Sequence, residues 1–395
     1  MSCATAWAAA FLMALPLGLV SATAGPPSAA GPSAADYVIL FARLPAERAH
    51  YGSDAVAAVD SSLRFMVVHA RDPAALERRA RADPDVLRYE RDSLGMQALL
   101  APADPLFAGY QYDLKAATTG IDAAWDTTTG APTVLVCVVD TGQYRAHQDF
   151  AGTHWGAWKD FVAGKATPYD DNGHGTHVTG TIAATLGNAD GIAGIAPGVT
   201  VAGAKVLNRQ GSGTYSAVAS GIAWCADQGA AVVNLSLGGA DSATVASAVS
   251  YATAKGALVV AAAGNSGPCT SCVGYPAAQP EAFAVACTDA ADLLCSFSSQ
   301  GPEVDIAAPG KDIVSTYPAG IQPCQKRNGD CFVLLSGTSM STPHVAGLAA
   351  LVKSAHPAFT NADLRARLQA TALDLGAPGA DAQFGAGLVQ GEAVL

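Results

Sequence analysis

The sequence predicts an α/β protein whose main domain is a doubly wound, mainly parallel sheet, preceded by a small α+β unit. After residue 104, short continuous apolar runs alternate with longer segments of helical periodicity. Continuous apolar runs are typical of parallel strands buried on both faces, and their alternation with helices predicts crossover connections. We expect strands at 133–139, 199–207, 231–236, 257–263 and 282–287. We expect helices near 174–186, 214–229, 241–255, 339–356 and 361–372.

The start of the chain has the pattern of a secretory signal peptide. An apolar run over residues 4–20 precedes Ala22-Thr23-Ala24, which matches the small-residue cleavage site of exported proteins. A membrane anchor is the alternative, but the run is short and no second long apolar run follows. We therefore expect residues 1–24 to be a signal peptide, whose removal leaves a secreted protein without a membrane segment. Residues 25–35 have the Gly, Pro, Ser and Ala content of a flexible linker.

Residues 36–92 are expected to fold as the small α+β unit. The expected order is strand, helix, strand, helix and strand, at 37–41, about 45–59, 64–70, 73–82 and 86–90. Residues 93–103 are apolar, uncharged and rich in turn-forming residues, which is typical of a connection between domains. The main domain is expected at 104–395.

Ser339 is the first candidate for a reacting group. It lies in Gly337-Thr338-Ser339-Met340-Ser341, directly before a nearly all-apolar segment with helical spacing. Free backbone N–H groups at a helix N-terminus stabilise a developing oxyanion. A lone serine in this position is more simply a helix N-cap. A catalytic role therefore needs a base and a residue that orients the base.

Asp140 and His174 occur in contexts that supply these two groups. Asp140 ends the apolar run 133–139, and open α/β sheets place their chemistry at the carboxyl ends of such strands. His174 lies among the small residues of Asn172-Gly173-His174-Gly175-Thr176, which allow close backbone approach. A fourth segment, Ala262-Ala263-Gly264-Asn265-Ser266-Gly267, contains the amide side chain of Asn265.

These four segments resemble the motifs of the subtilisin family (subtilases). The chain order Asp140, His174, Ser339 is the subtilisin order and differs from that of chymotrypsin and of the α/β-hydrolases. The resemblance implies that residues 104–395 form a serine peptidase domain that needs no cofactor for catalysis. It implies Ser339 as nucleophile, His174 as base and Asp140 as its orienter, with Asn265 and the Ser339 N–H as oxyanion donors.

The resemblance also implies how an extended peptide would bind. Two backbone edges, at 211–213 and 236–238, would pair with the substrate, although plain glycine turns stay open as the alternative for 211–213. The first specificity pocket would be lined by small residues without an acidic group, which predicts large apolar side chains before the cleaved bond. The expected substrate-binding residues are Gly211, Ser212, Gly213, Tyr215, Val218, Ser236, Leu237, Gly238, Ala262, Gly264 and Gly274.

Residues 36–92 resemble the inhibitory propeptide of subtilases, a small ferredoxin-like unit. The resemblance implies a zymogen whose own propeptide assists folding and acts as an intramolecular inhibitor until the chain is cut within 93–103. An ordinary small domain is the alternative. The expected partners are protein or peptide substrates, and the expected state is a monomer.

A structural calcium site is a further expectation from the resemblance. Asp149 matches a family ligand, and the loop 186–192 offers side-chain and carbonyl oxygens of the kind that Ca²⁺ binds. This loop is one residue longer than the usual family form, and a turn without metal is the alternative. The expected ligands are Asp149, Asn188, Asp190 and Ile192.

Nine cysteines are present, and Cys3 would leave with the signal peptide. The remaining even number predicts disulfides in a secreted protein. The short spacings favour Cys269–Cys272, Cys287–Cys295 and Cys324–Cys331, whereas Cys137 and Cys225 are either a pair or two buried thiols. A zinc site would need a repeated Cys or His spacing, which the sequence lacks.

Composition and motif details disfavour other function classes. The net charge of −11 argues against nucleic acid as a partner. His177 follows His174 without the Glu of a metalloprotease motif, and Ser339 lacks the Gly two residues later that an esterase nucleophile elbow needs. A non-catalytic protein on the same fold would not be expected to keep all four motifs.

Overall fold

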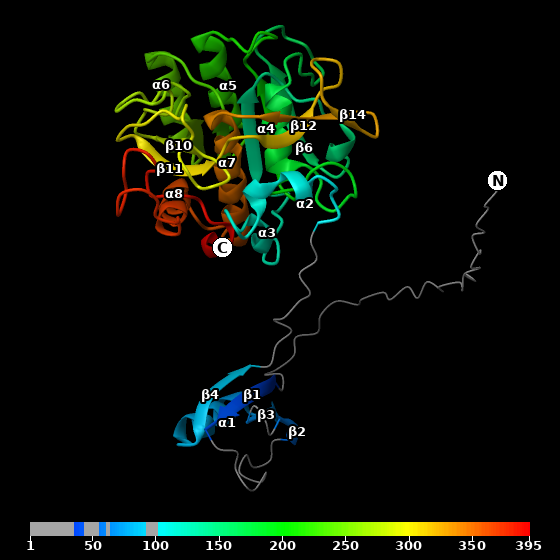
Figure 1. The fold of residues 1–395 in the computed structure, drawn as a ribbon, viewed down its shortest axis with the longest axis vertical. Helices are drawn as coiled ribbons and strands as arrows, with labels where there is room; N and C mark the ends of the chain where they lie inside the picture. Colours follow the sequence, from blue (N-terminus) through cyan, green and yellow to red (C-terminus); the bar gives the residue numbers. More distant parts are fainter. Residues whose placement is uncertain (1–34, 43–54, 61–63, 92–101) are drawn as a thin grey trace, which may run out of the picture. The chain divides into compact units, whose positions relative to one another are not determined.

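The structure, a computed structural model, describes residues 35–42, 55–60, 64–91 and 102–395 (Figure 1). They belong to two compact units, 1–99 and 100–395, and each is described by itself. The expected signal peptide, nearly all of the linker and most of the segment 93–103 lie outside the described residues.

The N-terminal unit is a four-stranded antiparallel sheet with one helix. Its sheet order is β2-β3-β1-β4. Alternate residues of β1, namely Tyr37, Ile39 and Phe41, are buried and share a small core with Leu76 of the helix. The elements are β1 Ala35–Phe41, β2 Ala55–Asp60, β3 Phe65–Ala70, α1 Pro73–Ala82 and β4 Val86–Arg91.

The prediction of a helix at about 45–59 is wrong for its last five residues, which belong to strand β2. β2 pairs with β3 and forms an edge of the sheet. The segment Ala55-Val56-Ala57-Ala58-Val59 is too short for periodicity to separate helix from strand, and pairing with the free edge of β3 decides the outcome. The earlier part of that helix lies outside the described residues.

The main unit confirms the predicted doubly wound sheet. Seven parallel strands lie in the order β11-β10-β9-β8-β5-β7-β6. The chain passes from β5 to the edge strand β6, returns to β7 beside β5, and then crosses to β8 and continues outward to β11. The strands are β5 Leu135–Asp140, β6 His154–Asp160, β7 Thr200–Lys205, β8 Val232–Leu235, β9 Leu258–Ala262, β10 Ala282–Thr288 and β11 Val304–Pro309.

Helices cover both faces of this sheet (Figure 1). Val136 and Val138 of β5 pack in one core with α4 and α7, whereas Cys137 and Val139 pack in a second core with α5 and α6. Because successive strand residues face opposite sides, two covered faces make β5 apolar throughout. The helices are α2 Phe107–Tyr110, α3 Ile121–Ala124, α4 His174–Ala183, α5 Tyr215–Asp227, α6 Ala243–Ala254, α7 Thr338–Ala355, α8 Asn361–Ala370 and α9 Gly391–Val394.

Five strands of the main unit are not predicted by the sequence pattern. β6 and β11 are the two edges of the parallel sheet; β6 is half exposed, and Asp305 and Pro309 interrupt the apolar pattern of β11. The other three form a small antiparallel sheet in the order β12-β14-β13. They are β12 Ile313–Tyr317, β13 Gln325–Arg327 and β14 Asp330–Leu335.

Four disulfides join the cysteines of the main unit. They are Cys137–Cys225, Cys269–Cys272, Cys287–Cys295 and Cys324–Cys331. The three local pairs are thus confirmed, and Cys137 and Cys225 are a pair. In the described ranges, no helix combines the length and apolar composition that a membrane span requires.

Candidate active site

Asp140 and His174 form a direct pair at the carboxyl edge of the sheet. Asp140 is the last residue of β5 and His174 is the first of α4. Asp140 Oδ1 lies 2.8 Å from His174 Nδ1, and the carboxylate is almost fully buried. Burial lowers the pKa of His174, but the Asp140 charge and hydrogen bond, together with the Asp170 charge, raise this pKa above its ordinary 6.5. This arrangement fixes the ring and keeps Nε2 for chemistry.

The loop before His174 is shaped by Asp170 and two glycines. Asp170 accepts hydrogen bonds from the backbone of Gly173 and from the Thr176 hydroxyl. Gly173 has φ 103°, a conformation that favours glycine, and Gly175 lies so close to Gly142 that a side chain would collide with it. The small residues around His174 are therefore needed for the approach of α4 to β5.

His177 is not part of this pair. Its Nε2 contacts the carbonyl oxygens of Ile313 and Val333 at 3.0 and 3.2 Å. Burial lowers the pKa of His177 to about 3, so the ring is neutral. It is a buried helix histidine, as the missing metalloprotease motif predicts.

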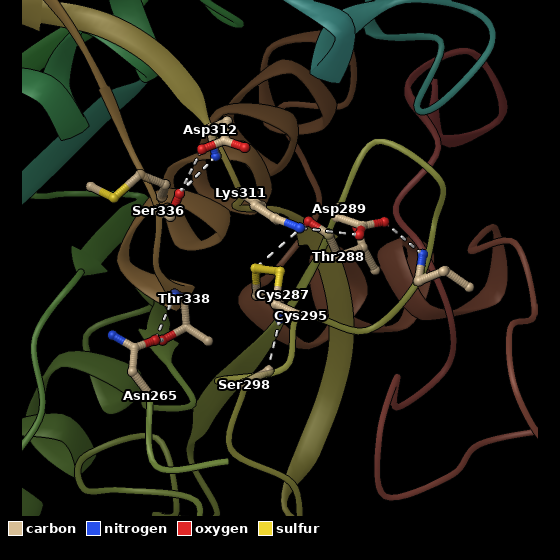
Figure 2. The surroundings of a disulfide bond; sticks show 12 residues. Asn265, Cys287, Thr288, Asp289, Cys295, Ser298, Lys311, Asp312, Ser336 and Thr338 are labelled. Carbon is tan, nitrogen blue, oxygen red and sulfur yellow. Dashed lines mark hydrogen bonds and ion pairs between the residues drawn. A yellow bond between two sulfur atoms is a disulfide. The ribbon is translucent and has the colours of Figure 1, made fainter. Parts of the chain in front are cut away.

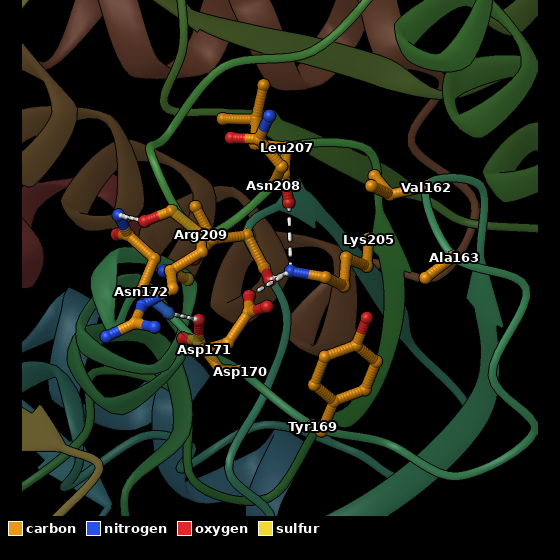
Figure 3. Close-up of polar contacts among 12 residues, drawn as sticks. Val162, Ala163, Tyr169, Asp170, Asp171, Asn172, Lys205, Leu207, Asn208 and Arg209 are labelled. Atoms are coloured by element: carbon orange, nitrogen blue, oxygen red, sulfur yellow. Dashed lines mark hydrogen bonds and ion pairs between the residues drawn. The ribbon is translucent and has the colours of Figure 1, made fainter. Parts of the chain in front are cut away.

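Lys205 is a fully buried cation that the sequence analysis did not select (Figure 3). Lys205 is the last residue of β7 and lies opposite Asp140 in the pairing of β7 with β5. Its ammonium donates to Asp171 Oδ1 at 2.7 Å, to the Leu207 carbonyl at 2.9 Å and to the Thr141 carbonyl. Lys205 thereby joins the end of β5, the loop before His174 and the start of the segment that leads to 211–213.

Ser339 is held at the start of α7 by Ser236. Pro343 within α7 has no N–H, so the Ser339 carbonyl lacks its usual helical donor. That carbonyl accepts from Ser236 Oγ at 2.8 Å, and Ser339 Oγ donates to the Ser236 carbonyl at 3.1 Å. In the structure the Ser339 hydroxyl thus contacts Ser236 rather than His174, although both Ser339 and His174 line one cleft.

Asn265 is oriented by Thr338 (Figure 2). Asn265 Oδ1 accepts from the Thr338 N–H and hydroxyl, each at 3.0 Å, and the hydroxyl accepts from Gly264 N at 3.1 Å. With its oxygen occupied, the amide offers Nδ2. A Cβ built on Gly337 would lie 3.4 Å from this Nδ2, 3.7 Å from Ser339 N and 3.8 Å from Asn265 Oδ1, so both donor nitrogens border one small space. That space suits an oxyanion.

The disulfide Cys287–Cys295 braces the neighbourhood of Asn265 (Figure 2). The segment that follows Cys295 contributes Ser299, whose N–H donates to the Gly264 carbonyl at 2.8 Å. Ser299 Oγ accepts from Ser266 N at 3.2 Å. Both neighbours of Asn265 in the chain are therefore fixed to the segment that this disulfide anchors.

Two adjoining hollows run past Ser339, with volumes of about 540 and 380 Å³. The first, the cleft, is lined by His174 and Ser339, and the second, the side pocket, by Asn265 and Ser339. All predicted substrate-binding residues line one of the two. The cleft contains Gly211, Ser212, Gly213, Tyr215, Val218, Ser236, Leu237 and Gly238, and the side pocket contains Leu237, Gly238, Ala262, Gly264 and Gly274. Sequence reasoning missed Val245 and Ala246 of α6 in the cleft and Cys272 in the side pocket.

Known proteins resemble this chain in sequence and in fold. The pattern of the Subtilase family matches residues 131–387. The chain belongs to the subtilase family. Thermitase of Thermoactinomyces vulgaris is 45% identical over 272 residues, which cover 69% of this chain and 91% of thermitase. The thermophilic serine proteinase of Bacillus sp. (strain AK1) is 39% identical over 323 residues, covering 82% and 76%.

A solved structure agrees with the sequence matches. A protease from Pseudoalteromonas arctica superposes with a TM-score of 0.67 at 29% identity, covering 75% of this subtilase and 98% of that chain. This subtilase is a serine endopeptidase, and subtilases need no cofactor for catalysis.

The predicted calcium ligands of this subtilase lie close together, and the structure also places Asp104 beside them. Asp149 accepts from Asn188 Nδ2 and from Ile192 N, both at 2.9 Å, and Asp104 accepts from Asn188 N at 3.2 Å. Burial raises the pKa of Asp149 to about 8, and the charges of Asp104 and Asp190 add to the effect. Nothing in the sequence pattern marked Asp104, because only the fold brings it to this loop. Within the described ranges, no three His, Cys, Asp or Glu side chains converge as metal ligands.

Proposed function

We propose that this subtilase is secreted as a self-processing zymogen and cleaves peptide bonds through Asp140, His174 and Ser339. The observation that carries the proposal is the 2.8 Å contact of Asp140 with His174, on the cleft that Ser339 also lines. An acid that orients an imidazole beside a serine is the arrangement of a catalytic triad.

The proposed reaction begins when Ser339 Oγ attacks the substrate carbonyl carbon. His174 Nε2 takes the hydroxyl proton and then delivers it to the leaving amine, while Asp140 holds Nδ1–H and stabilises the imidazolium. Water attacks the resulting acyl-enzyme by the same proton route and regenerates the serine. Without substrate, the Ser339 hydroxyl donates a hydrogen bond to the Ser236 carbonyl. It must therefore rotate away from that carbonyl before the attack.

The developing oxyanion would lie between the Ser339 N–H and Asn265 Nδ2. The first turn of α7 leaves the Ser339 N–H without a helical acceptor. Thr338 holds the amide of Asn265 so that Nδ2, and not Oδ1, points to the same space. Two preorganised donors aimed at this oxygen stabilise the transition state more than the substrate.

Protein or peptide substrates would pair in extended form with the edges at 211–213 and 236–238, and place the side chain before the cleaved bond in the side pocket. Among the residues that the structure describes, no Asp, Glu, Lys or Arg lines this pocket, which supports a preference for large apolar groups. A Cβ added to Gly274 would meet no atom closer than 3.8 Å, so the space at the pocket base is free for a substrate side chain.

The unit within residues 36–92 would act as the propeptide and inhibitor of the monomeric enzyme, after a signal peptide at 1–24 directs secretion. Its position before the peptidase domain, and its own core around Ile39 and Leu76, support a separately folded segment. Self-processing predicts that a Ser339→Ala precursor is exported but stays uncut between 93 and 103.

A structural calcium ion is the second part of the proposal. Asp149 is fully buried, and Asp104 and Asp190 raise its pKa further, so a divalent cation would stabilise this acidic group. The residues that would hold the ion are Asp104, Asp149, Asn188, Asp190 and the Ile192 carbonyl. The side-chain oxygens of Asp104, Asp149 and Asn188 now accept hydrogen bonds in this loop, so they would have to turn toward the ion on binding. Its role would be to fix the loop 186–192.

The triad is tested by kcat/KM on one peptide for the parent, Ser339→Ala and His174→Ala. We expect each substitution to lower kcat/KM by more than about a thousand-fold. Ser341→Ala is a matched control, because Ser341 lies in the same motif and its buried hydroxyl has no hydrogen-bond partner in the described ranges. It should stay within a few-fold of the parent. A Ser339→Ala protein that keeps a tenth of the parental rate would overturn the proposal.

A further inference from the structure

A disulfide-closed loop borders the side pocket. The loop 267–273 is held near its two ends, because Gly267 N donates to the Phe297 carbonyl at 2.9 Å and Cys272 N to the Gln300 carbonyl at 2.8 Å. The disulfide Cys269–Cys272 closes the tip of the loop, and Cys272 is also one of the two residues that these backbone bonds hold. The disulfide therefore constrains the part of the loop that the backbone bonds leave free.

Cys272 contributes directly to the lining of the side pocket. Gly264 and Gly274, which line the same pocket, present no side chain. The disulfide-bonded Cys272 therefore forms part of the wall beside these two glycines.

The Cys269–Cys272 disulfide also differs from the others in its exposure. Both of its residues are partly exposed, whereas Cys137, Cys225, Cys287 and Cys295 are at most 2% exposed, and Cys331 is fully buried. Thiol–disulfide exchange requires access of a thiolate to a sulfur atom. Within the described ranges, this is therefore the disulfide in which both cysteines are most accessible to a reductant in solution.

We propose that the Cys269–Cys272 disulfide is a specificity-determining wall of the side pocket, and that a dithiol which opens it weakens the preference for large apolar side chains while the triad keeps working. This inference rests on the proposed role of the side pocket. Without the cross-link, the tip of the loop gains conformational freedom that a large side chain must remove on binding.

The redox step is an ordinary exchange. One thiolate of the dithiol attacks a protein sulfur and breaks the Cys269–Cys272 bond, which gives a mixed disulfide. The second thiolate then attacks that mixed disulfide and closes the reductant into a cyclic disulfide. The two protein sulfurs leave as thiolates and take up one proton each, so two electrons pass from the dithiol to the protein.

The test compares kcat/KM for matched peptides with Phe or Ala before the cleaved bond. The double variant Cys269→Ser/Cys272→Ser should lower the Phe-to-Ala ratio by about three- to ten-fold, mainly through KM for Phe, because a short cross-link restrains only a few residues. Dithiothreitol on the parent should give the same change, with labelling and peptide mass spectrometry placing the new thiols at 269 and 272. The same reductant should leave the double variant unchanged. If the double variant does not fold, the reduced parent decides alone.

Two further variants separate the causes of a negative result. Cys324→Ser/Cys331→Ser removes another short disulfide that lines neither hollow, and it should leave the ratio unchanged. Gly274→Val should lower the ratio strongly, because it fills the pocket base. A ratio within two-fold of the parent in the serine double variant or the reduced parent, with Gly274→Val still effective, overturns the disulfide proposal. An ineffective Gly274→Val would mean that the side pocket itself is misplaced, and the proposal fails with it.

Discussion

Ser236 and Ser339 hold each other by two hydrogen bonds that run in opposite directions. Ser236 Oγ donates to the Ser339 carbonyl at 2.8 Å, and Ser339 Oγ donates to the Ser236 carbonyl at 3.1 Å. The first bond exists because Pro343 cannot donate to that carbonyl in the usual helical way. The proposed substrate-binding edge at 236–238 and the proposed nucleophile are therefore fixed to each other in the absence of substrate.

Ser236→Ala should destabilise the protein by about 0.5–1.5 kcal/mol, because the Ser339 carbonyl loses its donor. Pro343→Ala restores a helical N–H for the same carbonyl. We therefore expect the loss in the double variant to be smaller than the sum of the two single losses. Urea unfolding in a Ser339→Ala background, which prevents self-digestion, measures all three values. Strict additivity would show that Pro343 and Ser236 do not share this carbonyl.

Thr338 should act through Asn265 rather than on the substrate. Asn265→Ala is expected to lower kcat by about 10²–10³, the value known for loss of this donor in subtilisin. Thr338→Val removes the hydroxyl that holds the amide but keeps the backbone N–H, so kcat should fall less, by about ten-fold, with KM little changed. Thr338→Ser keeps the hydroxyl and should recover most of the rate. A Thr338→Val variant that acts on KM alone would contradict this role.

The pH dependence of kcat/KM should report the raised pKa of His174. Only the neutral imidazole can accept the Ser339 proton, so the rate is lost as pH falls through this pKa. Because Asp140 raises the pKa, the midpoint of the acid limb should lie above 6.5. Asp140→Asn removes the charge and should lower kcat by about 10⁴ and shift the residual acid limb to lower pH. A parental midpoint below 6.5, or a shift to higher pH in Asp140→Asn, would show that Asp140 does not set the pKa.

Calcium should stabilise the native state by mass action. At a free concentration of one hundred times its Kd, an ion that binds only the folded protein adds about 2.7 kcal/mol. We expect a chelator to lower the Tm of the Ser339→Ala protein, and Asp104→Asn to reduce that sensitivity. Identical melting curves in chelator and in calcium would remove the ion from this account.

The proposed triad could be placed from sequence because each of its residues lies in a local signature. Asp140 ends a strand that is buried on both faces, and Ser339 lies in the first turn of a largely buried helix, so their neighbours in the chain already fix their setting. The five central strands and the large helices were predicted for the same reason. Edge strands such as β6 lack that uniform apolar pattern and were missed.

Other features depend on residues that meet only in the folded chain. Lys205 is an ordinary strand-end lysine in the sequence. Of its three oxygen acceptors in the folded protein, only the Leu207 carbonyl is near it in the chain, and those of Thr141 and Asp171 come from distant segments. Asp104 reaches the loop 186–192 from the start of the domain, and Cys272 reaches the side pocket from a loop tip. The periodicity of one segment carries no information about contacts between segments that are distant in the chain.

The most direct measurement of the central claim is the site of covalent labelling by an organofluorophosphonate. The reagent phosphonylates a serine that a neighbouring base activates, so peptide mass spectrometry should find one adduct per molecule, on Ser339. His174→Ala should abolish the labelling, and Ser341→Ala should keep it. An adduct on another residue, or undiminished labelling of Ser339 in His174→Ala, would contradict the assignment of Ser339 as a nucleophile activated by His174.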